Sequence, residues 1–215
     1  MSMADVALYL VLAAVGVAVF LAIRSDSRKD KEVKEMWRRF AESRGLKEEA
    51  PGEFRLPRFT GLNRGFPFAL EVVVTSGDRV RLGRVQVSAG DKTRTYTAFK
   101  VATPGMPAGL KIYKGGLVAR LAEKMGMGHV ETGDAAFDKA FTVAADAGNE
   151  AAAFLTPERR ALLMGALEDP GIVEIEGGEL VLMKSGKVGD VMEMERLFEK
   201  AGGMASALAG GRRSG

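Results

Sequence analysis

The hydrophobic pattern begins with an uncharged apolar run near the amino end of the sequence. Residues Val6 to Ile23 read VALYLVLAAVGVAVFLAI, eighteen residues bounded by Asp5 and Arg24. As an α-helix rising about 1.5 Å per residue, the run is roughly 27 Å long, which matches the hydrocarbon core of a bilayer. A helix that is apolar all round is not typical of the surface of a soluble domain. The pattern predicts a single-pass transmembrane helix over residues 6–23.

The residues that flank this run indicate whether it is cleaved or retained, and how it is oriented in the membrane. A cleaved signal peptide is the alternative, but residues 1–5 contain no lysine or arginine and no A-x-A cleavage site closes the run. Positive charge follows the run instead, so the positive-inside rule places residues 24–215 in the cytoplasm, anchored to the inner membrane of the cell. Four cations beside the span are expected to contact the membrane surface: Arg24, Arg28, Lys29 and Lys31.

The next segment, residues 27–44, has the pattern of an amphipathic helix. It is highly charged except for one apolar stripe at helical spacing: Val33, Met36, Trp37, Phe40 and Ala41. Ser27 is the expected amino-terminal cap, and Gly45 is placed to end the helix. The stripe suits either lipid headgroups or the surface of the following domain, and we favour the domain because Trp37 lies fourteen residues beyond the span. A polar connection is expected over residues 47–52.

Residues 53–113 alternate between apolar and polar positions at the period of β-strands. They predict a β-meander of three strands: residues 66–75, 79–88 and 93–102. In the middle strand the apolar positions change parity at Gly83, which predicts a bulge or a bend. Three further elements are expected to follow: a loop over 103–109, a strand over 110–113 and a helix over 117–125.

The remainder of the chain mixes strand and helix signals. Residues 137–145 suit a strand, and residues 150–155 suit a short helix capped by Asn149. Three later elements have strong boundary signals: a helix opened by Thr156 and Pro157, a hairpin around Gly177-Gly178, and a last helix started by Asp190 with Glu193 and weakened at Gly202-Gly203.

The order of these elements predicts the fold class and the domain boundaries. Strands come first and later mix with helices, which favours an α+β fold over a doubly wound one. Four segments are expected: an anchor over residues 1–25, a juxtamembrane helix and connection over 26–52, a single α+β domain over 53–208, and a flexible tail over 209–215.

Charge is distributed unevenly along the chain, although the net charge is only +3. Residues 54–128 contain 13 Lys and Arg against 4 Asp and Glu, whereas residues 129–200 contain 7 against 15. The basic stretch either faces the anionic inner leaflet, or is neutralised by the acidic stretch within one fold. Head-to-tail self-association is a third interpretation.

The residue types narrow the chemistry that the chain can perform. The sequence has no cysteine and one histidine, so disulfides, thiolate nucleophiles and sites built on two histidines are excluded. It also contains no Walker loop, dinucleotide fingerprint or nucleophile elbow. The densest group of candidate ligands is His129, Glu131, Asp134 and Asp138. We interpret this group as structural because the segment looks like a turn with a capping aspartate, and we expect no metal, no cofactor and no nucleic-acid partner.

A short motif gives the sequence a resemblance. A segment of the form D-x-x-F-D-x-x-F-x-V precedes a Leu-Thr-Pro sequence, here at Asp134, Phe137, Asp138, Phe141 and Val143, then Leu155, Thr156 and Pro157. With the apolar run and the Trp37 segment, this order resembles a group of bacterial membrane-anchored proteins of unknown function. The resemblance implies an integral membrane protein and transfers no catalytic residues.

Two hypotheses of function follow from the sequence. The leading one is a non-enzymatic, membrane-tethered module that contacts the lipid bilayer, a protein partner or a second copy of itself. The alternative is an enzyme at the membrane surface that uses the acidic residues around 129–138 in a cleft.

Overall fold

The structure is a computed structural model of the chain. It describes residues 30–49, 58–76, 80–82, 85–87, 93–107, 109–114, 130–169 and 171–210. The predicted span over residues 6–23, the predicted helix over 117–125 and the tail beyond residue 210 lie outside these residues. None of the described helices has the length and apolar character needed to cross a membrane.

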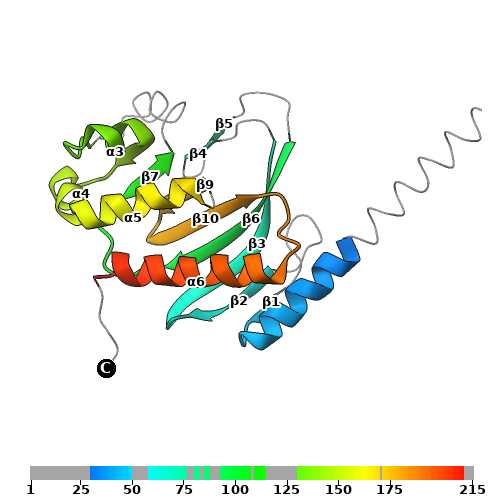
Figure 1. Ribbon diagram of the computed structural model, residues 1–215. Coiled ribbons are helices and arrows are strands. Elements are labelled where there is room, and N and C mark those ends of the chain that lie inside the picture. The colour runs from blue at the N-terminus through cyan, green and yellow to red at the C-terminus, as the bar shows by residue number, and fades with distance from the viewer. Residues whose placement is uncertain are drawn as a thin grey trace, which may run out of the picture.

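An eight-stranded antiparallel sheet forms the body of the molecule (Figure 1). Its strands lie in the order β1-β2-β3-β6-β10-β9-β7-β8. Their bounds are β1 Lys47–Glu49, β2 Arg58–Asn63, β3 Phe66–Ser76, β6 Thr93–Ala102, β7 Lys111–Lys114, β8 Phe141–Ala144, β9 Gly171–Glu176 and β10 Glu179–Ser185. The predicted α+β class is confirmed.

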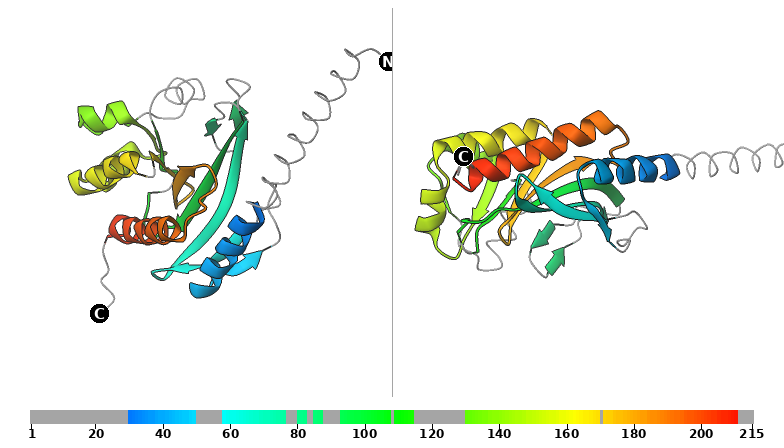
Figure 2. Two further views of the ribbon diagram at one scale, coloured as in Figure 1. Left: turned by 45° about the vertical axis from the view of Figure 1, so that its right-hand side comes forward. Right: turned by 90° about the horizontal axis from the view of Figure 1, so that it is seen from below.

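Helices lie on one face of this sheet. The first described helix, over residues 30–43, is called the Trp37 helix here. The others are α3 Ala135–Ala140, α4 Gly148–Phe154, α5 Pro157–Glu168 and α6 Val191–Leu208. The Trp37 helix, α5 and α6 all lie on the same side of the strands (Figure 2). No described helix packs on the opposite side, which we call the uncovered face.

The hydrophobic core lies between the sheet and these helices. Alternate residues of the central strands are buried there, including Leu70 of β3, Phe99 of β6 and Leu182 of β10. Phe198 of α6 meets Phe40 of the Trp37 helix edge-on, with ring centroids 5.6 Å apart. The core therefore unites the first described helix with the last.

The apolar stripe of the Trp37 helix packs on the domain, as we favoured. Trp37, Phe40 and Ala41 are fully buried, and Val33 and Met36 pack against the core. The Trp37 indole Nε1 donates a hydrogen bond of 2.8 Å to the carbonyl oxygen of Val188, just before α6. Because a buried indole N–H needs an acceptor, this bond fixes the helix relative to the β10–α6 connection.

The predicted polar connection over residues 47–52 is wrong at its start, because residues 47–49 form strand β1. Gly45 adopts a φ of 65° and ends the Trp37 helix as expected, after which Leu46 is buried. The chain then pairs with β2, with Lys47 opposite Thr60. Short, charged strands are common at the edges of sheets, where the charge discourages pairing with another chain. The strand was missed because its residues have no apolar alternation.

The predicted three-stranded meander is also wrong in its middle strand. Residues of the expected strand over 79–88 form β4 Val80–Leu82 and β5 Val85–Val87, which pair with each other in a separate two-stranded sheet. Strand β3 pairs directly with β6. The register places Val80 opposite Val87, so the parity change at Gly83 reflects a reversal of the chain between β4 and β5.

Two expectations after residue 130 are corrected as well. The predicted strand over 137–145 is helix α3 followed by the shorter strand β8, because Asp134 caps the start of a helix. The short helix near Asn149 exists as α4, but its cap position is Ala147 and no side chain caps it.

The strongest local signals of the carboxyl half are confirmed. Thr156 caps α5 and Pro157 is its first residue. Gly177 and Gly178 both have positive φ, as a tight hairpin between β9 and β10 requires. Asp190 caps α6 by accepting a hydrogen bond of 2.8 Å from the Glu193 backbone N–H.

The expected weakening of the last helix at Gly202-Gly203 is wrong, because α6 continues to Leu208. A Cβ atom at Gly202 would lie 2.2 Å from Oδ1 of Asn63, which is buried in β2. The Asn63 amide donates a hydrogen bond of 2.6 Å to the carbonyl oxygen of Phe198. Because Gly202 has no side chain, β2 can lie close to α6 at this point. The glycine does not end the helix.

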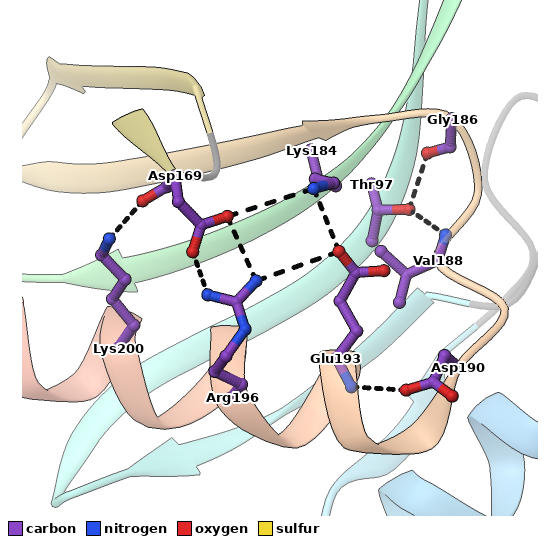
Figure 3. A network of polar contacts seen from close by, with 9 residues as sticks. All are labelled: Thr97, Asp169, Lys184, Gly186, Val188, Asp190, Glu193, Arg196 and Lys200. Carbon is purple, nitrogen blue, oxygen red and sulfur yellow. Dashed lines mark hydrogen bonds and ion pairs between the residues drawn. The ribbon is translucent and has the colours of Figure 1, made fainter. Parts of the chain in front are cut away.

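Polar contacts hold α6 to the end of α5 and to β10 (Figure 3). The Asp169 carboxylate pairs with Arg196, which lowers the pKa of Asp169, and the Asp169 carbonyl accepts a hydrogen bond from Lys200. Lys184 of β10 lies 3.0 Å from Glu193. These side chains are partly exposed, so we expect each pair to contribute well under 1 kcal/mol.

The two glycines of α6 provide a matched pair of substitutions. We expect Gly202→Ala to destabilise the fold by about 1–3 kcal/mol, because the added methyl group overlaps the Asn63 side chain. Gly203→Ala is the control, because nothing lies within 4 Å of its Cβ position. It should stabilise the helix by about 0.5–1 kcal/mol. Urea unfolding of the detergent-purified chain measures both changes, and equal effects would contradict the role given to Gly202.

Candidate functional site

The acidic residues around 129–138 stabilise the start of α3. Asp134 accepts hydrogen bonds of 3.1 Å from the backbone N–H groups of Ala136 and Phe137, and it pairs with Arg160. The bond from Phe137 and the Arg160 guanidinium lower the pKa of Asp134. Asp138 accepts hydrogen bonds from the backbone and hydroxyl of Thr132.

These contacts leave little support for a catalytic or metal-binding role of the same group. Asp134 and Asp138 are engaged within their own loop, Glu131 is exposed, and His129 lies outside the described residues. Within the described ranges, no three His, Asp or Glu side chains are placed to hold a metal ion.

The other residues of the short motif also have structural roles. The rings of Phe137 and Phe141 lie 4.8 Å apart in the core, and Leu155 is fully buried. Thr156 and Pro157 form the start of α5. The motif therefore describes how α3, β8 and α5 fit together.

A row of polar side chains crosses the uncovered face of the sheet. The strand register aligns Lys100 of β6 with Val181 of β10, and Val181 with Glu174 of β9. Ile112 lies opposite Ile175, so the antiparallel register brings Tyr113 of β7 beside Glu174. Tyr113 in turn lies opposite Thr142 of β8. We call Lys100, Glu174, Tyr113 and Thr142 the polar row.

Tyr113 and Glu174 form the most unusual part of this row. Tyr113 is only 3% exposed, and its side chain lies near the Glu176 carboxylate. Burial raises the pKa of Tyr113, and the nearby Glu176 carboxylate raises it further. Burial also raises the pKa of Glu174 to about 7, and Glu176 adds to that shift while Lys100 opposes it. Polar groups perturbed in this way are found often at functional sites.

Ion pairs surround the polar row. Glu71 of β3 pairs with Lys100 and lies 3.6 Å from Arg58 of β2. On the other side, Lys111 of β7 lies 3.5 Å from Glu176 of β9. The uncovered face therefore holds a protonatable carboxyl and a buried phenol between paired charges.

Four of the described cations of the basic stretch pair with carboxylates: Arg58, Arg64, Lys100 and Lys111. Arg64 lies 3.0 Å from Glu199, and Lys114 donates to the carbonyl oxygen of Gly171. The Arg64 and Lys111 pairs join the basic stretch to the acidic one. These contacts favour neutralisation within the fold over a basic sheet that faces lipid.

The predicted membrane-surface cations are described only in part. Lys31 is exposed on the Trp37 helix, whereas Arg24, Arg28 and Lys29 lie outside the described residues. The polar row was not predicted from the sequence. The one sequence feature that indicates it is Glu174. This residue lies between the apolar residues Val173 and Ile175, so in a strand its side chain faces away from the core.

Comparisons with protein-family models, with curated proteins and with solved structures find no match to this chain. The function must therefore be inferred from the sequence and from the geometry described above.

The Glu174 carboxyl should make stability depend on pH near neutrality. Its pKa rises from 4.5 to about 7 on folding, so between these values the folded chain holds a proton that the unfolded chain has lost. Stability should fall as the pH rises through this window. Glu174→Gln should remove the loss, and its stability relative to the natural chain should rise by up to about 3 kcal/mol between pH 4 and pH 8.

Urea unfolding at both pH values measures this difference. Glu179→Gln is the control, because Glu179 is exposed on the adjacent strand β10. If the two variants show the same pH dependence, Glu174 is not the group responsible.

Proposed function

We propose that the protein is a non-enzymatic, membrane-tethered module that binds a partner protein through its uncovered face. The observation that carries the proposal is the one-sided cover of the sheet by the described helices. A solvated sheet face is ordinarily polar. Here apolar side chains lie half-buried among the ion pairs: Val73, Tyr96, Ile172, Val181 and Met183. Mixed surfaces of this kind are typical of protein interfaces.

The tether is the apolar run over residues 6–23. Its length, its lack of charge and the cations that follow it support a single-pass anchor in the inner membrane with the domain in the cytoplasm. The described domain begins at Asp30, seven residues after Ile23. A domain attached so closely stays at the membrane surface.

The contacts of the basic stretch favour a protein partner over lipid for the sheet. Arg58, Lys100 and Lys111 already pair with carboxylates. Contact with lipid headgroups is assigned instead to the cations beside the span: Arg24, Arg28, Lys29 and Lys31. The partner is either another protein or a second copy of this chain, and cross-linking can distinguish the two.

The tether can be tested by placing charge inside the apolar run. Leu12→Arg with Val15→Arg should release the chain from membranes, because each arginine costs about 2.5–3.5 kcal/mol at the centre of a span. We expect the natural chain to stay in the membrane fraction after alkaline extraction and the variant to be extracted. Leu12→Ile with Val15→Leu is the matched control. Extraction of the natural chain would exclude an integral anchor.

The binding surface can be tested by photo-cross-linking in cells. A photoreactive amino acid at Met183, on the uncovered face, should give a discrete cross-linked product in the membrane fraction. The same amino acid at Ala161, an exposed position of α5, should not. A product of twice the chain's mass indicates a second copy, and any other discrete mass indicates a different protein. Equal products from both positions, or none from Met183, would contradict the proposal.

A further inference from the structure

Two large apolar side chains are exposed on the first turn of α6. Val191 is 48% exposed and Met192 is 77% exposed, whereas α6 buries apolar residues along its later turns. Among the described residues the other large apolar side chain of this kind is Leu62, which is 61% exposed on β2. Exposing adjacent apolar side chains to water at the start of a helix is unfavourable in free energy, unless another surface covers them.

The start of α6 is fixed to the end of the Trp37 helix that is nearest the predicted span. Lys187 Nζ lies 2.8 Å from Asp30, the first described residue of that helix. Val188 accepts the hydrogen bond from the Trp37 indole, and a Cβ atom at Gly189 would lie 3.5 Å from Val33. In Figures 1 and 2 the residue-30 end of the helix and the start of α6 point to the same end of the molecule.

The length of chain between the span and the domain brings this end close to the bilayer. Six residues lie between Ile23 and Asp30, so seven residue-to-residue steps join them. They cover about 10 Å as a helix and roughly 25 Å if fully extended. The headgroup region adds about 5–8 Å beyond each side of the hydrocarbon core. A connection of this length therefore keeps Asp30, and Lys187 beside it, within about 25 Å of the end of the predicted span.

We propose that the first turn of α6 inserts Val191 and Met192 into the headgroup region of the bilayer that holds the span. This inference rests on the proposed tether and extends it, because a second contact fixes the orientation of the domain. Lys31 is exposed on the Trp37 helix, one residue from the Asp30 that pairs with Lys187, and it suits lipid phosphates. The acidic side chains of the turn are occupied, since Asp190 caps the helix and Glu193 pairs with Lys184 (Figure 3).

The absence of cysteine from the sequence allows a direct test. Met192→Cys and Leu62→Cys each provide one site for an environment-sensitive fluorophore such as NBD. Leu62 is the matched control because it is also apolar and exposed, but it lies on β2 beside Asn63, which contacts the later turns of α6. Each labelled full-length chain is reconstituted into vesicles of phosphatidylcholine and phosphatidylglycerol, with and without a spin-labelled quencher lipid.

We expect the label at residue 192 to show blue-shifted emission that the quencher lipid reduces, whereas the label at residue 62 shows neither effect. Val191→Asp added to the residue-192 chain should abolish the shift while the chain still floats with the vesicles. An acidic residue is tolerated in the first turn of a helix, so this variant should fold.

The outcomes separate the two proposals. If the chain floats with the vesicles but the label at residue 192 is neither shifted nor quenched, the α6 contact is wrong and the tether stands. The same holds if the labels at residues 192 and 62 respond alike. If the chain does not float and is removed from vesicles by alkaline extraction, the tether and the α6 contact both fail.

Discussion

Packing of α6 across the sheet is the constraint on which the rest of the structure depends. An antiparallel sheet must bury one face, and α6 supplies an apolar side from Met194 to Leu208 that lies over β6, β10 and β2. The helix approaches β2 closely because Gly202 has no side chain where Asn63 lies. The Trp37 helix then packs against α6 through Phe40 and Phe198. The position of the Trp37 helix, at the amino-terminal end of the described domain, is therefore set by α6.

Elements with local signals could be predicted from the sequence. The Gly177-Gly178 hairpin, the Thr156-Pro157 helix start and the Trp37 stripe each depend on neighbouring residues, and each was found where expected. Choices of strand partner depend on distant residues. The separate pairing of β4 with β5, the direct pairing of β3 with β6, and the addition of β1 at the edge therefore could not be read from the pattern.

The polar row illustrates the same limit for the candidate site. Alternation in β9 indicates that Glu174 faces away from the core, but nothing near it in sequence indicates that Tyr113 lies beside it. That neighbour follows from the pairing of Ile112 with Ile175, which joins segments far apart in the chain. The raised pKa of Glu174 follows from burial in the folded sheet. The group that stands out in the sequence is instead His129, Glu131, Asp134 and Asp138, because these residues lie close together along the chain.

The two proposed surfaces are compatible because they belong to opposite layers of the molecule. Val191 and Met192 lie in the helical layer, whereas Glu174 and Tyr113 lie on the far side of the sheet. Contact of the first turn of α6 with headgroups would thus leave the far side of the sheet away from the lipid. A flexible tether alone would let the domain rotate and present any side to the membrane. The second contact would hold the uncovered face in one orientation, which lowers the entropy lost when a membrane-bound partner binds.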